Sequence, residues 1–446
     1  MSASSPPVPR RQLGFWMCLA LVVGNIVGSG VYLLPASLAP YGLNSVLGWI
    51  VTCGGGITLA IVFARLAKIF PQAGGPYVYA RVAFGDGTGF LMAWGYWMGV
   101  WVGNAAIAIA TVAYLAELVP WIKNTTGGPA IASCVIIWLL TYLNYRGTRQ
   151  MGAVQIVTTI LKLLPLVAIV ALGLSLLMSG DPSVIKVEAQ PFSVAAIHSS
   201  AALTLWALLG LESATVPAGK VQNPERNIPL ATLWGTVAAS AIYILACSVV
   251  VMLIPGEELA KSSAPFADVI RLFWGDKIAS TLALFAFISG FGALNGWILL
   301  QSEMPRVLAN EGVFPRWFAR ESRHGTPGVA LVISSLLLTG VVLMNYSRSM
   351  VQVFTSIILI STSAYLMMYL TCAVGALKLC WSGALGAAGR RLSPFLLVAL
   401  LAMLYSGWTL LGAGLEPLLW SIALFAAGLP VYWLMKRFGA AATHSG

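Results

Sequence analysis

The chain has 446 residues, of which 59% are hydrophobic and only 9% are charged. Charged residues make up about a quarter of a soluble domain, so this composition excludes an ordinary soluble protein. The net charge of +11 does not indicate nucleic-acid binding, because the basic residues are spread along the chain and form no patch with interleaved aromatic residues.

Twelve apolar runs are long enough to cross a bilayer, whose hydrocarbon core is spanned by a helix of about 20 residues. They cover residues 13–38, 43–66, 88–118, 129–145, 153–178, 196–218, 231–254, 278–304, 328–345, 350–376, 393–413 and 416–435. The sequence therefore predicts an all-α integral membrane protein with twelve transmembrane helices. The first run is too long for a signal peptide and has no small-residue cleavage site, so we expect no cleavable leader.

The basic residues predict the orientation of these spans. Most of the 25 Lys and Arg residues lie in the cytoplasm if residues 1–12 form a cytoplasmic tail, as the positive-inside rule requires. An even number of spans returns the carboxyl terminus to the same side. We therefore expect a multi-pass protein of the cell (inner) membrane with both termini in the cytoplasm.

No pattern of catalytic or metal-binding residues is found. The six cysteines are scattered without C-x-x-C pairs, and the three histidines are far apart in sequence. No phosphate loop, nucleophile elbow or dinucleotide motif is present. The sequence predicts that the protein is not an enzyme, has no metal or cofactor, and acts on a small molecule within the lipid bilayer.

The first span is interrupted at its centre by the segment Gly24-Asn25-Ile26-Val27-Gly28-Ser29-Gly30. Glycine weakens a helix and frees backbone amides that lipid cannot satisfy, so such a break is tolerated where it lines a cavity. Close packing of small residues is the alternative explanation. It is less favourable here, because three small residues in consecutive positions do not share one helix face.

A second interrupted segment, residues 204–214, lies about half a chain later and contains the charged residue Glu212. Paired interrupted helices in corresponding halves indicate the binding site of a secondary transporter. Residues 13–178 and 196–376 would each form a repeat of five spans, and an odd number of spans makes the two repeats inverted. Helices 11 and 12, within 393–435, stand outside the repeats, and we treat residues 1–446 as one transporter domain.

Four separated motifs together resemble one family. They are residues 24–30, Gly74 to Tyr77, Trp206 to Glu212, and Asn223 to Pro229. The chain resembles the amino acid–polyamine–organocation superfamily, and within it the basic amino acid/polyamine antiporters, which exchange arginine for agmatine, lysine for cadaverine or ornithine for putrescine. The resemblance covers essentially the whole chain. It implies a LeuT-type fold of five-plus-five inverted repeats, with helices 1 and 6 broken and two helices added, and leaves a homodimer as a candidate assembly.

The two breaks predict how the α-amino acid group would be held. The amides of Ser29 and Gly30 lie at the positive end of a half-helix and are expected to bind the substrate α-carboxylate. The resemblance assigns the α-amino group to three carbonyls on the opposite half-helix, those of Trp206, Ala207 and Leu209.

Most Trp and Tyr residues of a membrane protein lie at the membrane–water interface or pack between helices. Two Trp residues differ from these because small or helix-breaking residues lie next to them. Gly210 follows Trp206 closely, and Asn295-Gly296 precedes Trp297. The resemblance places Trp297 against the aliphatic and cationic end of the substrate, with Trp206 as a gate above it. The face of a Trp ring attracts cations by about 0.5–2 kcal/mol.

One face of the third span carries Tyr96, Val100 and Asn104, at positions i, i+4 and i+8. Val100 and Asn104 are expected in the substrate site. Asn104 would hydrogen-bond the distal end of the substrate and Tyr96 would close the extracellular side. The alternative for Asn104 is an ordinary polar contact between helices.

Two ionisable residues within the spans are candidates for gating or proton coupling. An acid within a membrane span is functional by default, and Glu212 matches a carboxylate linked to gating and acid response in the arginine/agmatine antiporters. Its alternative is a helix-end carboxylate solvated by the cytoplasmic vestibule. Lys162 departs from those antiporters, which have an uncharged residue there, whereas proton-coupled members of the superfamily have a lysine. Its ammonium is expected to bond carbonyls around Val27 and Gly28.

Two functions therefore stay open. The first is an exchanger of a cationic amino acid and a related amine or amino acid by alternating access, which Trp297, Asn104 and the motifs favour. The second is a proton-coupled symporter or facilitator of neutral amino acids, which Lys162 favours. Protons are a candidate partner in both.

Overall fold

The computed structural model of the chain describes residues 13–28, 30–72, 74–146, 151–188, 190–216, 218, 221–323, 325–344, 349–384 and 394–443. Within these ranges every regular element is a helix, apart from one β-bridge between Leu13 and Val221. The prediction of an all-α protein is confirmed.

The α-helices vary from single turns to long membrane-length rods. In chain order they are α1 (Phe15–Ile26), α2 (Gly30–Leu38), α3 (Asn44–Ile69), α4 (Pro76–Phe84), α5 (Asp86–Leu118), α6 (Trp121–Asn124), α7 (Gly128–Tyr145), α8 (Met151–Ser179), α9 (Val194–Leu208), α10 (Pro224–Leu253), α11 (Gly256–Leu259), α12 (Pro265–Trp274), α13 (Asp276–Asn310), α14 (Gly328–Met344), α15 (Met350–Trp381), α16 (Pro394–Gly412), α17 (Leu415–Ala426) and α18 (Gly428–Thr443). Short 3-10 turns are η1 (Ala39–Tyr41), η2 (Pro182–Val184) and η4 (Arg316–Ala319).

The described residues contain ten helical stretches that are long and apolar enough to cross a membrane. Two shorter apolar helices, α9 and α14, accompany them. Each apolar run predicted from the sequence coincides with one of these twelve helical segments, counting α1 with α2 and α17 with α18 as single stretches. The chain is therefore a multi-pass membrane protein.

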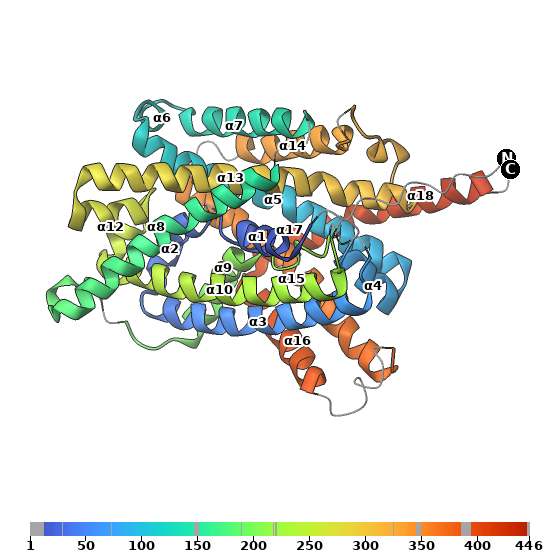
Figure 1. Cartoon of the computed structure of the whole chain (residues 1–446), viewed down its shortest axis with the longest axis horizontal. Helices are drawn as coiled ribbons and strands as arrows, with labels where there is room; N and C mark the ends of the chain where they lie inside the picture. Colours follow the sequence, from blue (N-terminus) through green and yellow to red (C-terminus); the bar gives the residue numbers. More distant parts are fainter. Residues whose placement is uncertain are drawn as a thin grey trace.

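Both interruptions fall where the sequence predicts them. Helix α1 ends at Ile26 and α2 begins at Gly30. Helix α9 ends at Leu208, and turns occupy residues 209–216 in place of a continued helix. Figure 1 shows α1 and α9 near the middle of the molecule, between the long helices α13 and α10.

Helix α5 is the most enclosed of the long helices, with 94% of its apolar window buried. It packs against α13 on one side and α15 on another, while α3 packs against α10 and α9. Helices α7 and α14 lie side by side at one edge of the molecule (Figure 1). This arrangement surrounds the two broken helices with protein, as backbone that leaves the helical form in a membrane requires.

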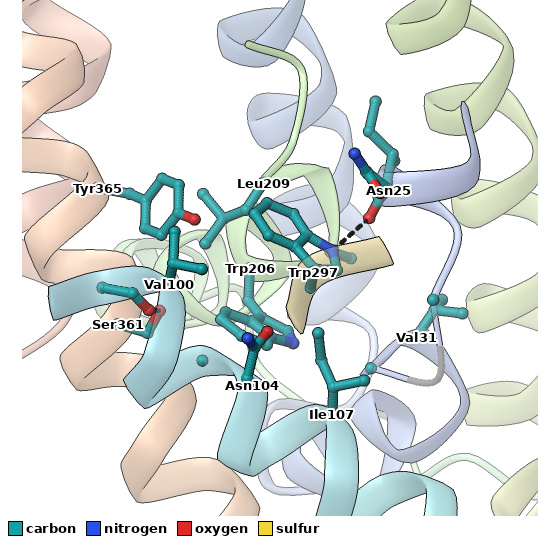
Figure 2. Close-up of a pocket in the computed structure, with 16 residues that line it drawn as sticks. Asn25, Val31, Val100, Asn104, Ile107, Trp206, Leu209, Trp297, Ser361 and Tyr365 are labelled. Carbon is teal, nitrogen blue, oxygen red and sulfur yellow. Dashed lines mark hydrogen bonds between the residues drawn. The ribbon is translucent and has the colours of Figure 1, made fainter. Parts of the chain in front are cut away.

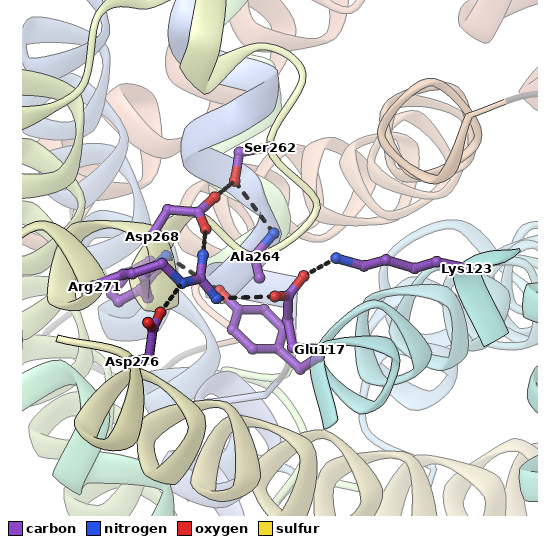
Figure 3. Close-up of polar contacts among 9 residues, drawn as sticks. Glu117, Lys123, Ser262, Ala264, Asp268, Arg271 and Asp276 are labelled. Atoms are coloured by element: carbon purple, nitrogen blue, oxygen red, sulfur yellow. Dashed lines mark hydrogen bonds and ion pairs between the residues drawn. The ribbon is translucent and has the colours of Figure 1, made fainter. Parts of the chain in front are cut away.

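An ionic cluster connects the loop helix α12 to its neighbours (Figure 3). Arg271 on α12 pairs with Asp268, with Glu117 of α5 at 3.0 Å and with Asp276 of α13 at 3.2 Å. Glu117 also pairs with Lys123. Arg271 is 39% exposed, so its ion pairs stabilise the structure only weakly.

The buried side of α12 contacts the half-helix α2. The Phe266 ring packs edge-on against Tyr32 at 5.2 Å, and the Tyr32 ring also meets Tyr114 of α5 at 5.7 Å. The Tyr114 hydroxyl donates to the Tyr32 carbonyl at 2.8 Å. Aromatic contacts of this kind contribute about 0.5–1.5 kcal/mol beyond burial. They hold α2 against the long helix α5.

Candidate functional site

A cavity lies where the two interrupted helices meet (Figure 2). Its walls come from α1, α2, α5, α9, α13 and α15. The lining residues are Asn25, Ile26, Gly28, Gly30, Val31, Gly99, Val100, Gly103, Asn104, Ile107, Trp206, Ala207, Leu209, Trp297, Ser361 and Tyr365. The walls are mostly apolar with a few polar groups, which is the usual character of a small-molecule site.

The end of α1 explains why the cavity can exist in a membrane. The last four carbonyls of any helix have no partner within that helix, and a lipid environment cannot supply one. In α1 the last bond of the helix itself runs from the Val27 amide to the Val23 carbonyl (2.7 Å). The next three carbonyls accept hydrogen bonds from other helices: Gly24 from Lys162 Nζ (2.8 Å), Asn25 from Trp297 Nε1 (3.2 Å) and Ile26 from the Tyr243 hydroxyl (2.8 Å). Three helices, α8, α13 and α10, therefore cap the broken end.

Trp206 occupies space that two glycines leave open. A Cβ atom at Gly30 would lie 2.6 Å from Trp206 Nε1, and one at Gly103 would lie 2.7 Å from the far end of the same ring. Such distances are too short for side-chain atoms, so only glycine fits on either side. The indole of Trp206 consequently lies between α2 and α5 at the edge of the cavity.

Trp297 reaches the cavity from α13. Its indole nitrogen donates to the Asn25 carbonyl, a bond drawn in Figure 2, and its ring lies edge-on to Tyr365 at 6.5 Å. Gly210 lies against the ring and has a φ of +105°, a conformation that favours glycine. The side chain is thus held by both interrupted segments.

Asn104 both lines the cavity and makes a polar contact between helices, the two alternatives that its sequence position left open. It is 1% exposed and lines the cavity, and its Nδ2 also donates to Gln301 Oε1 of α13 at 2.8 Å. The polar contact between helices and the place in the cavity wall are therefore not exclusive.

Most of the residues predicted to bind substrate come together in this one cavity. They are Gly30, Val100, Asn104, Trp206, Ala207, Leu209 and Trp297. Ser29, the remaining member of the predicted set, lies outside the described residues.

Sequence reasoning missed several lining residues. Asn25 lies within the glycine motif, is 3% exposed, and has neither side-chain polar atom hydrogen-bonded within the described structure. Burying a polar group without a hydrogen-bond partner is costly. A polar residue inside this otherwise apolar glycine motif was therefore a signal that the sequence offered. Ser361 and Tyr365 of α15 had no such signal, because they belong to an apolar run without an interruption. Ser361 Oγ donates to the Gly99 carbonyl at 2.8 Å.

Glu212 lies outside the cavity, in a fully buried cluster of tyrosines behind Tyr365. The Tyr369 hydroxyl donates to Glu212 Oε2 at 2.5 Å, and the rings of Tyr365 and Tyr369 are 6.0 Å apart. Tyr96 contacts Tyr365 edge-on at 5.3 Å and its hydroxyl faces Glu212. Among the described residues, neither Glu212 Oε1 nor the Tyr96 hydroxyl has a hydrogen-bond partner. The alternative of a carboxylate solvated by an open vestibule does not fit a side chain with no exposed surface.

Tyr96 lies in the first third of α5. It is ten residues into the helix, about 15 Å from its start at Asp86. It precedes the cavity-lining residues of α5 and lies beside Glu212 and Tyr365. In the predicted topology this part of α5 belongs to the cytoplasmic half, which disagrees with the prediction that Tyr96 closes the extracellular side. The side that Tyr96 closes stays a prediction.

Lys162 of α8 is completely buried and does not line the cavity. Its Nζ donates to the Gly24 carbonyl, and the Tyr32 hydroxyl donates to the Lys162 carbonyl at 2.5 Å. The predicted partners were carbonyls around Val27 and Gly28, so the contact is one turn earlier. The physical reason is that α1 stays helical as far as Ile26, which makes Gly24 one of its unpaired carbonyls. A cation there also meets the negative end of the α1 dipole.

Comparisons with known proteins identify the family of the chain. The family model described as "Amino acid permease" matches residues 13–442. A Bacillus subtilis protein that is provisionally named an arginine/ornithine antiporter is 32% identical over 95% of this chain and 96% of its own length. The cadaverine/lysine antiporter of Escherichia coli is 34% identical over 75% of both chains. A putrescine transporter of Haemophilus influenzae is 31% identical over 97% of this chain and 98% of its own length.

The family and these relatives are transporters, which confirms that the chain is not an enzyme. The similarity extends over both interrupted helices and the long helices that surround them. With the motifs of the two breaks, it shows that the chain belongs to the amino acid permease family.

Proposed function

We propose that the protein is a secondary active exchanger that moves a cationic amino acid against a related amine or amino acid by alternating access. The observation that carries the proposal is the meeting of two half-helix ends with Trp297 and Asn104 in one cavity. The relatives support the choice of substrate class, since their names are those of antiporters or transporters of arginine, ornithine, lysine, cadaverine and putrescine.

The cavity offers different chemistry at its two ends. The amide of Gly30 at the start of α2 would hold the α-carboxylate together with that of Ser29, which lies outside the described residues. The carbonyls of Trp206, Ala207 and Leu209 would hold the α-amino group. The substrate side chain would extend along Trp297 and Val100 toward Asn104. The face of an aromatic ring and an amide oxygen both suit a terminal cation.

The proposed topology follows the helices and the charge pattern. Twelve spans would form two inverted five-span repeats, residues 13–178 and 196–376, with helices 11 and 12 added within 393–435. The arrangement is of the LeuT type, in the cell (inner) membrane with both termini cytoplasmic. The whole chain, 1–446, would then be a single transporter domain. A homodimer is a proposed assembly to which we assign no interface.

Exchange is favoured over proton symport of neutral amino acids by the names of the relatives. The position of Lys162 is compatible with exchange, because its amine donates to the Gly24 carbonyl and caps the end of α1. Protons are proposed to act through Glu212. A carboxylate gains or loses a proton within a cluster of tyrosine hydroxyls, and this would change the closure made by Tyr96 and Tyr365.

Counterflow in proteoliposomes tests the function. Labelled lysine, arginine or ornithine should enter only when the vesicles contain a cationic amino acid or its amine, because exchange needs a substrate on both sides. Empty vesicles under an imposed pH gradient provide the comparison. Accumulation there of a neutral amino acid, with no counterflow of cationic ones, would support the symport alternative and contradict the proposal.

Trp297→Ala should weaken substrate binding at least about tenfold, because both the ring face and the bond that caps Asn25 are lost. The affinity of the Trp297→Phe protein should lie between those of the wild type and of Trp297→Ala, since phenylalanine keeps an aromatic ring. Binding can be measured by isothermal titration in detergent. Trp420→Ala is the matched control, because Trp420 is 55% exposed. Unchanged affinity of the Trp297→Ala protein for every transported substrate would remove Trp297 from the site.

Glu212→Gln should flatten the dependence of exchange rate on pH while substrate affinity is preserved. Glutamine mimics the protonated carboxyl, so the rate of the variant at neutral pH should approach the rate of the wild type in acid. Rates of counterflow across acidic and neutral pH provide the measurement, and Glu416→Gln, at an exposed acid, is the control. A pH profile equal to that of the wild type would assign Glu212 a structural role.

Lys162→Ala should slow exchange and lower the thermal stability of the protein in detergent. It leaves the Gly24 carbonyl without its partner in the bilayer, at a cost of about 1–3 kcal/mol. The ratio of substrate taken up to substrate released should stay as in the wild type. Loss of a pH-driven accumulation would instead identify Lys162 as a proton carrier, and wild-type rates and stability would leave it a packing residue.

A further inference from the structure

A chain of hydrogen bonds leads from the cavity to the edge of the molecule. Asn104 Nδ2 of α5 donates to Gln301 Oε1 of α13 at 2.8 Å, and Gln301 Nε2 donates to Ser335 Oγ of α14 at 3.2 Å. Ser335 Oγ meets Thr141 Oγ1 of α7 at 2.7 Å. All four side chains are at most 2% exposed. Four helices are thus joined through side chains of which only Asn104 lines the cavity.

The direction of every bond in this chain follows from its far end. Thr141 Oγ1 lies 2.7 Å from the carbonyl of Ile137, which can only accept, so the single hydroxyl proton of Thr141 is used there. Ser335 must therefore donate to Thr141, and it can then only accept from Gln301. The amide nitrogen of Gln301 consequently faces Ser335 and its oxygen faces Asn104. This assignment rests on the network and not on the appearance of the amides.

We propose that this chain orients the Asn104 amide so that its oxygen, and not its nitrogen, is presented to the substrate. Gln301, Ser335 and Thr141 are positioning residues for the specificity of the site. The proposal rests on the proposed function, because it names the feature that selects a substrate whose side chain ends in a hydrogen-bond donor, such as an ammonium or guanidinium group. In Figure 2 Asn104 lies among the cavity side chains near Trp206.

The reversed chain is the competing state. If Asn104 presented its nitrogen, each bond would run the other way and Thr141 would donate to Ser335. The bond to the Ile137 carbonyl would then be lost. One net hydrogen bond corresponds to a preference of about fivefold for the observed direction. The apparent affinity for a ligand scales with the fraction of protein in the competent state, so the ratio of affinities for donor and acceptor ligands carries the same factor.

The test uses Thr141→Val, which keeps the shape of the side chain and removes the hydroxyl at the end of the chain. The probes are lysine, whose side chain ends in donors only, and methionine sulfoxide, whose side chain ends in an acceptor. Their affinities are measured by titration of the full-length protein in detergent. We expect the ratio of lysine affinity to methionine sulfoxide affinity to fall about fivefold in Thr141→Val and in Ser335→Ala.

Two controls separate orientation from general damage. Thr339→Val removes a hydroxyl on α14 that donates to the backbone carbonyl of Ser335 but makes no bond to the Ser335 hydroxyl. It therefore leaves the side-chain bonds of the chain in place and should keep the wild-type ratio. Thr141→Ser restores a hydroxyl that can donate to Ile137 and accept from Ser335, and it should restore the ratio. A purely structural effect would weaken both probes alike and leave the ratio unchanged.

The outcomes distinguish this inference from the proposed function. If the wild type prefers lysine and both chain variants keep that preference, the inference is overturned and the proposed function stands. If the wild type binds methionine sulfoxide at least as well as lysine, an acceptor at Asn104 and the cationic substrate class are both wrong. A reduced ratio in both variants, with Thr339→Val unchanged, supports the inference.

Discussion

The broken end of α1 is the constraint on which the rest of the site depends. A helix that stops inside a membrane leaves four carbonyls that lipid cannot satisfy. In α1 the carbonyls of Gly24, Asn25 and Ile26 are bonded by side chains of α8, α13 and α10, namely Lys162, Trp297 and Tyr243. These contacts position the cavity, because they hold the end of α1, and Asn25, Ile26 and Gly28 at that end form part of the cavity wall.

The same contacts connect binding with movement. Trp297 is a wall of the cavity and also the donor to α1, so a ligand that shifts its ring also shifts the cap of the broken helix. Lys162 lies away from the cavity and holds the same helix end from the other side. In the proposed mechanism of alternating access, a movement of α1 relative to its neighbours would break these bonds or move their donors with it.

The two polar regions next to the cavity differ in how completely they are satisfied. Asn104 is held by a chain of directed bonds, which suits recognition by a rigid group. Glu212 Oε2 accepts a hydrogen bond from Tyr369, whereas Glu212 Oε1 has no partner among the described residues. The hydroxyl of Tyr96 beside it also has no partner there. A buried polar atom without a partner is costly, and this distinguishes the Glu212 region from Asn104, whose amide nitrogen is hydrogen-bonded.

The sequence by itself determined the helical class, the positions of the spans and the two breaks. These features depend on run length and on glycines that are local in the chain, such as Gly28 and Gly30. The motifs of the chain, through their resemblance to a known family, added several of the residues that line the cavity, among them Trp206 and Trp297. Tertiary structure alone decided that Ser361 and Tyr365 line the cavity, that Tyr96 accompanies Glu212, and which carbonyl Lys162 bonds. Those outcomes depend on how helices far apart in sequence pack against one another. The spacing of residues within an apolar span does not indicate which other helix it packs against.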